Sequence, residues 1–189
     1  MTIKEFYNKV KKTGALAVAG LSALTGVGCA SRANYVAPYV GVKTQLQSKE
    51  DIGPIMTYGV RAGSSKDNEG FYVKAEYFET HETKTNAQLD STVYKLGAGI
   101  ERTKEYPRWR LTGRLGANLQ REHNTGFVGP MPINENETVF GLDAGASLEK
   151  RLGKKLSFFV GADVGYNIGS DMSNTTTEAT GSVGFRADF

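Results

Sequence analysis

The sequence contains a single cysteine, Cys29, with only two histidines and five prolines among its 189 residues. One cysteine excludes a disulfide within the chain. No residues stand at metal-ligand spacing, and no glycine-rich phosphate loop or nucleophile elbow occurs, so we expect no metal and no cofactor. No apolar run reaches the roughly 20 residues that a transmembrane helix needs. These absences exclude helical membrane proteins and the familiar metal and nucleotide enzymes.

The positive charge is confined to the start of the chain. The net charge of the whole sequence is +3, and residues 1–28 alone contain four lysines and one glutamate. The remainder is therefore close to neutral. It has no basic patch with interleaved aromatic residues, so we expect no nucleic-acid partner.

Residues 1–28 have the organisation of an export signal. Four lysines precede an uncharged, largely apolar run from Gly14 to Gly28. That run has the length of a signal-peptide core and is too short to cross a bilayer as a helix. A buried amphipathic helix is the alternative, but the run has no polar face. We predict a signal peptide over residues 1–28, or over residues 1–33 if cleavage occurs later.

Two cleavage sites remain open. The segment from Thr25 to Cys29 resembles a permissive lipobox, although Gly26 stands where leucine is usual. Cleavage there would leave Cys29 as the lipidation site of a lipoprotein. An ordinary signal peptidase would instead cut after Ala33 and discard the cysteine.

The rest of the chain alternates apolar and polar residues in strand-length segments, which are separated by glycine, asparagine, aspartate, serine and proline. The clearest segment runs from Leu156 to Ile168, with apolar residues at every even position. Pro38 interrupts the first segment, and because proline suits only a strand start or edge, we expect weak pairing there. The eight segments are 35–43, 56–63, 71–77, 94–101, 109–120, 140–148, 156–168 and 182–189.

The segments favour a membrane barrel over a soluble sandwich. They are 7–13 residues long, and the longer ones suffice for a tilted strand to cross a bilayer, whereas soluble sheets more often have strands of about 5–6 residues. A soluble lipocalin-like barrel would keep its apolar face inward, but here the polar face is rich in glycine and in charges of both signs. Aromatic residues gather at strand ends, as in interfacial girdles: Tyr35, Tyr58, Phe71, Tyr77, Tyr94, Trp109, Phe140, Tyr166 and Phe189. We predict an all-β fold, an eight-stranded antiparallel up-and-down transmembrane β-barrel over residues 34–189.

The links between segments alternate in length, as they do in outer-membrane barrels with short periplasmic turns and long external loops. The short turns 102–108 and 150–155 are basic, whereas acidic residues gather in the long links. The predicted external links are 44–54, 79–92, 121–138 and 169–178, and the predicted turns are 64–70, 102–108 and 150–155.

The last eight residues, Ser182 to Phe189, read polar, any, glycine, any, any, apolar, any, aromatic. This pattern resembles the insertion signal of bacterial outer-membrane barrels, which we assign to Gly184, Phe185 and Phe189. With the strand pattern, residues 34–189 resemble the small eight-stranded barrels of the OmpA/OmpX type, in the porin-like superfamily. The resemblance implies a monomer in the bacterial outer membrane, in contact with membrane lipid and lipopolysaccharide and inserted by the barrel-assembly machinery.

Charges of both signs lie on the predicted lumen face. Unpaired charges in a narrow interior would be costly, so we expect a salt-bridge network. The network either fills a closed lumen, which we favour, or rearranges to form a narrow porin-like channel for small solutes. The predicted set comprises Arg61, Lys74, Lys95, Arg110, Arg114 and Arg186, with Glu76, Glu101, Asp143, Asp163 and Asp188.

Two features of the external links suggest other functions. His81 and His123 are each followed two residues later by threonine, which loosely resembles the His-x-Ser arrangement of outer-membrane lipid A deacylases. No supporting acid can be assigned, so we favour solvated histidines and a protein that is not an enzyme, with a lipid A-modifying enzyme as the remote alternative. Residues 126–133 form an apolar patch. The patch fits either contact with an unknown surface partner or a strand end that caps the barrel mouth.

Overall fold

The computed structural model describes residues 33–46, 53–84, 87–128, 130–169 and 175–189. The predicted signal peptide over residues 1–28 and the lipidation candidate Cys29 lie outside the described residues. Both stay predictions, as does the choice between the two cleavage sites.

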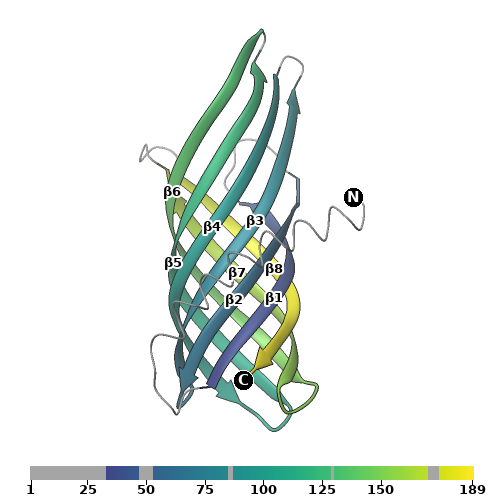
Figure 1. Cartoon of the computed structure of the whole chain (residues 1–189), viewed down its shortest axis with the longest axis vertical. Coiled ribbons are helices and arrows are strands. Elements are labelled where there is room, and N and C mark those ends of the chain that lie inside the picture. Colours follow the sequence, from purple (N-terminus) through teal and green to yellow (C-terminus); the bar gives the residue numbers. More distant parts are fainter. Residues whose placement is uncertain (1–32, 47–52, 85–86, 129, 170–174) are drawn as a thin grey trace.

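The described chain forms one closed antiparallel barrel, in which each strand pairs with its neighbour in sequence and the last strand pairs with the first (Figure 1). This confirms the predicted eight-stranded up-and-down barrel. Closure leaves no open sheet edge in the wall, as lipid demands. The strands are β1 (Ala33–Gln45), β2 (Ile55–Lys66), β3 (Glu69–Lys84), β4 (Ala87–Glu105), β5 (Trp109–Val128), β6 (Met131–Arg151), β7 (Leu156–Ile168) and β8 (Thr175–Asp188).

The barrel closes where β8 pairs with β1, in a register that runs from Tyr35 opposite Asp188 to Gln45 opposite Glu178. The ladder is interrupted at Pro38, which has no backbone N–H to donate. Gly184 lies beside this gap, and a Cβ there would come within 2.3 Å of the Pro38 carbonyl oxygen. The glycine of the insertion signal therefore also permits the close approach of the two closing strands.

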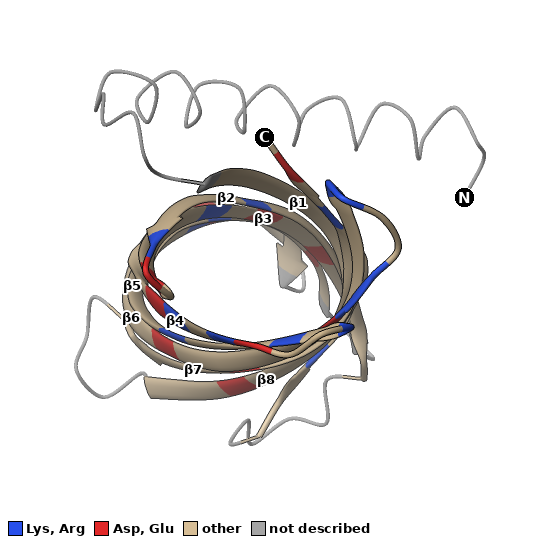
Figure 2. Ribbon diagram, turned by 90° about the horizontal axis from the view of Figure 1, so that it is seen from below, with Lys and Arg blue, Asp and Glu red and all other residues tan. Residues whose placement is uncertain are grey.

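Alternation along each strand divides the side chains between lipid and lumen. Charged residues of both signs recur around the ring of strands, as Figure 2 shows from below. Phe185 and Phe189 of the insertion signal are exposed on the outside, while Arg186 is buried inside. Tyr35 was expected in the outer girdle, but it is buried in the lumen. Every second residue of β1 from Tyr35 to Lys43 lies on the inner face of the barrel, so Tyr35 faces inward with Lys43. Other large apolar side chains exposed on the outer wall are Leu96, Ile100, Leu111, Leu115, Leu119, Leu142, Leu148, Val160 and Val164.

Glycines on β2 make room for the inward tyrosines of β1. A Cβ at Gly59 would lie 2.2 Å from the Tyr39 ring, and one at Gly63 would lie 2.5 Å from the Tyr35 ring. Both tyrosines pack in one buried cluster with Phe159 of β7. Aromatic rings from β1 and β7, which lie on either side of β8, therefore fill part of the lumen.

Two predicted external links are wrong, because the strands continue through them. The hairpin of β3 and β4 pairs up to Lys84 and Ala87, and the hairpin of β5 and β6 pairs up to Val128 and Met131. Both hairpins project beyond the rest of the barrel (Figure 1). The polar composition of 79–92 and 121–138 was read as loop, but a sheet with both faces in water is also polar.

The opposite end of the barrel has short turns, as predicted. Asp67 and Asn68 form the link between β2 and β3 with φ values of 52° and 71°, the left-handed geometry of a two-residue hairpin turn. The predicted turn 102–108 narrows to 106–108, because β4 continues to Glu105. No helix in the described parts of the chain is both long and apolar enough to cross a membrane.

Candidate functional site

The structure places all eleven charged residues predicted for the lumen on its inner face. It adds three more, Lys43, Glu149 and Glu178, each of which is buried. Positive and negative groups of this set balance, seven of each, so the set as a whole is neutral. The positive groups are Lys43, Arg61, Lys74, Lys95, Arg110, Arg114 and Arg186, and the negative groups are Glu76, Glu101, Asp143, Glu149, Asp163, Glu178 and Asp188.

The three additional residues had a weak sequence signal. Lys43 follows from strict alternation along β1, but Pro38 made the facing of that strand ambiguous. Glu149 continues the polar face of β6 one step beyond the predicted segment. Glu178 was assigned to an external link, whereas β8 begins at Thr175 and carries it into the barrel.

The periplasmic third of the lumen holds two arginines between two acids. One Arg110 amine lies 3.3 Å from both Glu149 and Asp188. Arg186 Nε lies 2.8 Å from an Asp188 carboxylate oxygen, and Arg186 Nη1 lies 3.5 Å from a Glu149 carboxylate oxygen. Each carboxylate is thus shared by both guanidinium groups, and β5, β6 and β8 are joined.

In the middle of the barrel, Asp163 of β7 lies between two more arginines. Its two carboxylate oxygens are 3.6 Å from Arg61 and 3.4 Å from Arg114. Arg114 also donates a 2.8 Å hydrogen bond to the Ser147 hydroxyl. Because β2, β5 and β7 are not adjacent, these contacts cross the lumen.

A lysine cluster follows toward the extracellular side. The two carboxylate oxygens of Asp143 lie 2.9 Å from the Lys74 ammonium and 3.1 Å from the Lys95 ammonium. Lys95 also pairs with Glu178, which lies 3.1 Å from Lys43. The chain of alternating charges runs through β1, β3, β4, β6 and β8, and it leaves each buried cation next to an acid.

Two tyrosines connect the aromatic cluster to these charges. The Tyr35 hydroxyl donates to Glu101 at 2.6 Å, and the Tyr39 hydroxyl donates to Glu76 at 2.9 Å. The Arg186 guanidinium lies 3.6 Å from the centre of the Tyr35 ring, a cation–π distance. The acids are therefore held by neutral donors as well as by cations.

An apolar layer lies beyond the lysine cluster. Ile55, Phe78 and Val93 face inward from β2, β3 and β4 and form one buried cluster. The Lys43 ammonium lies 4.0 Å from the centre of the Phe78 ring. On this side of the lumen, the layer lies between the lysine cluster and the extracellular end.

The periplasmic mouth contains a polar cavity of about 780 Å³, whose floor includes Arg110, Arg186 and Asp188. Glu105 and Arg151 lie on its rim, with their charged atoms 2.6 Å apart. The hydrogen bond from Arg151 holds the pKa of the Glu105 carboxyl below its ordinary value.

The two histidines lie on the outer face of the projecting hairpins, in strands rather than loops. His81 Nδ1 is 2.7 Å from an Asp90 carboxylate oxygen, and His123 Nδ1 is 3.0 Å from the Asn136 side-chain oxygen. The Thr125 hydroxyl donates to the Asp90 backbone carbonyl, so His123 does not activate it here. Among the described residues, no group of three or more histidine, cysteine, aspartate or glutamate side chains is placed to hold a metal ion.

The projecting hairpins form a four-stranded sheet with two open edges. Residues 131–139 of β6 pair with β5, while pairing of β6 with β7 starts only at Phe140. On the other side, residues 80–84 of β3 pair with β4 alone among the described residues. Backbone donors and acceptors along both edges therefore have no strand partner in the described parts of the chain.

No protein-family model matches this chain, and no curated protein matches it. Solved structures do. The structure of the Neisserial surface protein A, NspA, superposes with a TM-score of 0.63 at 16% identity, over 83% of this chain and 99% of that chain. Ail, the attachment invasion locus protein of Yersinia pestis, gives a TM-score of 0.55 at 16% identity, over 84% of this chain and 99% of that chain. The outer membrane protein OprG from Pseudomonas aeruginosa gives a TM-score of 0.55 at 12% identity, over 85% of this chain and 96% of that chain.

At these identities the similarity shows the fold and leaves the role open. The chain shares its fold with these outer-membrane proteins, and its barrel has an apolar outer wall and a charged interior. The chain is a small eight-stranded β-barrel of the bacterial outer-membrane type.

Proposed function

We propose that this protein acts at the cell surface, by binding an extended, basic protein segment along the open edge of its extracellular sheet. The observation that carries this proposal is the one-sided pairing of residues 131–139 in β6. An edge of this length offers a template for β-augmentation, in which backbone hydrogen bonds supply affinity and side chains supply specificity.

The interior supports a surface role rather than transport. The charge network and the apolar layer of Ile55, Phe78 and Val93 lie across the lumen. A solute path would require several buried pairs to separate, each at a cost of several kcal/mol. A narrow channel is therefore the second candidate. For an enzyme, His81 has a carboxylate partner in Asp90, but the Thr125 hydroxyl bonds the Asp90 carbonyl and not His123.

The charge of the sheet indicates the chemistry of the partner. Its described side chains beyond Tyr94 and Phe140 include five carboxylates and one guanidinium. A structure of Ail contains the heparin analogue sucrose octasulfate, but this acidic sheet would repel such a polyanion and suits a cationic partner. The six groups are Glu79, Asp90, Glu122, Glu135, Glu137 and Arg121.

The tip of the longer hairpin adds apolar area. The described part of the predicted apolar patch, residues 126–128 and 130–133, lies at this tip, and Phe127 and Met131 are 57% and 71% exposed. The tip projects away from the barrel (Figure 1) and so does not cap its mouth. Exposed apolar side chains beside an open edge fit partner contact.

The test is a titration of the folded barrel, in detergent micelles, with an octapeptide of alternating lysine and valine. We expect binding of this peptide and weaker binding of the matching glutamate–valine peptide. Glu135→Lys should weaken binding of the lysine peptide roughly threefold, the value of an exposed ion pair. A variant that lacks residues 122–137 should not bind.

Glu69→Lys is the matched control, because it makes the same charge change at an exposed position of the periplasmic end. It should leave the affinity unchanged. Equal binding of the peptide to the parent and the deletion variant would refute the role of the edge. Equal losses of affinity in Glu135→Lys and Glu69→Lys would show that binding depends only on the net charge of the protein.

A further inference from the structure

A glycine interrupts the lipid-facing leucines of β5. Leu111, Gly113 and Leu115 share the outer face, and a Cβ at Gly113 would meet no atom within 4 Å. Packing within the barrel therefore does not require glycine here. Two cavities of about 510 and 540 Å³ lie on the outer wall, and Gly113 and Arg102 line both of them. The missing side chain opens a groove where a leucine would have filled the surface.

Charged groups of both signs line this groove. Arg102 is the cross-strand neighbour of Gly113 on one side and of Glu69 on the other. Arg102 Nε lies 3.8 Å from Glu69, too far for a hydrogen bond, and the two side chains are 84% and 72% exposed. Lys104 and Asp67 line the second cavity. Two cations and two carboxylates thus surround the groove with their charged ends available to a ligand.

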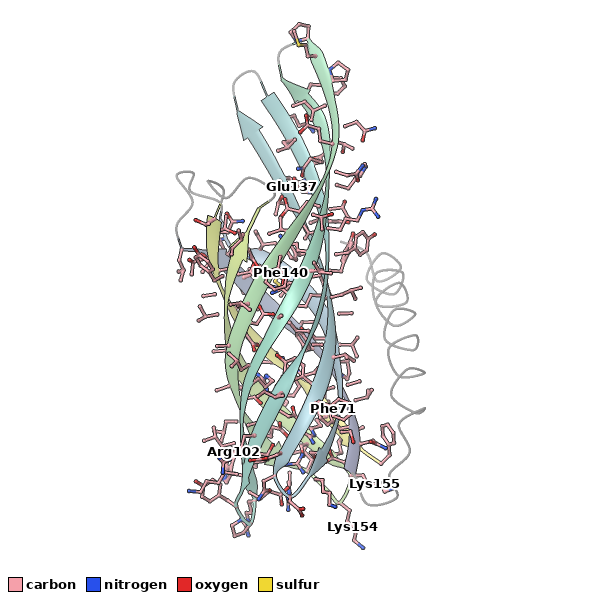
Figure 3. The ribbon with its side chains drawn as sticks, turned by 90° about the vertical axis from the view of Figure 1, so that its left-hand side faces the viewer. Phe71, Arg102, Glu137, Phe140, Lys154 and Lys155 are labelled. Atoms are coloured by element: carbon pink, nitrogen blue, oxygen red, sulfur yellow. The ribbon has the colours of Figure 1, made fainter. Side chains whose placement is uncertain are left out.

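The groove lies at the boundary between apolar wall and polar turns. One row nearer the membrane centre, Phe71, Ile100 and Leu115 are cross-strand neighbours. Figure 3 shows Phe71 on the wall, with Arg102 lower, near the end that bears Lys154 and Lys155. Short turns mark this end as periplasmic, so Arg102 lies at the level of the inner-leaflet headgroups. Outward charges at this depth are stable where the headgroups solvate them.

We propose that this groove binds one phospholipid molecule whose headgroup carries both a phosphate and a primary ammonium. The phosphate accepts charge-assisted hydrogen bonds from Arg102 and Lys104. The ammonium donates to Glu69 or Asp67, which a purely anionic headgroup would face without a counter-charge. An acyl chain lies over Gly113 against Ile100 and Leu115.

The experiment measures lipid retained by the folded barrel in native mass spectrometry, after incubation in micelles with phosphatidylethanolamine, phosphatidylglycerol or phosphatidylcholine. Phosphatidylethanolamine should be retained best. Arg102→Gln should lower retention of phosphatidylethanolamine about tenfold, the value of a charge-assisted hydrogen bond, and Gly113→Leu should do the same by filling the groove. The double variant Glu69→Gln/Asp67→Asn, which removes both carboxylates, should abolish the preference over phosphatidylglycerol.

Two matched controls separate the groove from general lipid contact. Gly181→Leu fills another outward position where a Cβ meets no atom within 4 Å. Lys150→Gln removes an outward cation beside Trp109 at the same end. Neither should change retention, and heat-modifiable gel mobility shows that every variant is folded. Equal retention of the three lipids, or equal losses in the control variants, would overturn the proposal in favour of annular lipid.

Discussion

Lys95 on β4 and Asp143 on β6 meet inside the barrel, with 3.1 Å between the ammonium and a carboxylate oxygen. Their strands are separated by β5, so the contact is across the lumen and cannot arise from cross-strand pairing in the wall. Lys95 also holds Glu178 of β8. One lysine therefore joins three strands on different sides of the barrel, and its loss leaves two acids short of a counter-charge.

Replacing Lys95 by methionine should destabilise the folded barrel by about 3–5 kcal/mol, the usual result of removing one partner from a buried ion pair. Urea unfolding of the protein refolded into lipid vesicles measures this change. The double variant Lys95→Met/Glu178→Leu should recover part of the loss, because it removes one of the stranded acids. A single variant within 0.5 kcal/mol of the parent, a threshold typical of surface changes, would show that the network adds little stability.

Gly59→Ala should destabilise the barrel by about 1–3 kcal/mol, the usual range for overpacking. The new methyl group would lie 2.2 Å from the Tyr39 ring, and the ring cannot retreat without giving up the hydrogen bond to Glu76. The same unfolding measurement on Gly181→Ala, where a Cβ has free space, should give no change. Equal values for the two variants would contradict the steric explanation.

Glu122 in the extracellular sheet should make stability depend on pH. Burial raises the pKa of the Glu122 carboxyl, and the charge of Glu137 opposite it acts in the same direction. The folded state therefore favours the protonated form, and stability falls as pH rises from the unfolded value of about 4.3 through the folded pKa. Glu122→Gln should be more stable than the parent at pH 7 and equally stable in acid. If the free energy of unfolding of parent and variant changed in parallel between roughly pH 3 and pH 7, this prediction would be refuted.

If the lumen is closed, as we propose, the protein in planar bilayers should give no reproducible single-channel conductance. The ion pairs of Asp163 with Arg61 and Arg114 cross the interior, and the apolar layer lies beyond them. Steady conductance that disappears in Arg114→Ala would establish the narrow channel in place of the closed barrel.

Much of this fold can be predicted from the sequence, because alternation of period two and barrel closure fix the direction of each side chain. The pattern around Arg114 and Asp143 placed both in the lumen without any knowledge of their partners. The pairing between Arg114 and Asp163 could not be read from sequence, since it depends on the stagger of three strands around the barrel.

The extracellular end was harder to predict for a physical reason. Residues 79–92 and 121–138 are polar on both faces because both faces meet water, so the period-two signal is lost and the composition resembles that of a loop. Glu178 was assigned to a loop for a different reason: β8 begins with threonines and has no large apolar residue there, so its alternation is weak, although Glu178 is buried beside Lys43. The groove at Gly113 depends on the absence of a side chain, and a glycine in a strand gives no indication by itself of what lies beside it.

Hydrogen–deuterium exchange of the backbone amides in residues 131–139, with and without the lysine–valine octapeptide, tests the proposed surface function most directly. An added strand along β6 should protect alternate amides of this segment and leave exchange in β7 and β8 unchanged. Binding of the peptide with no protection in residues 131–139 would contradict recognition at the edge of β6.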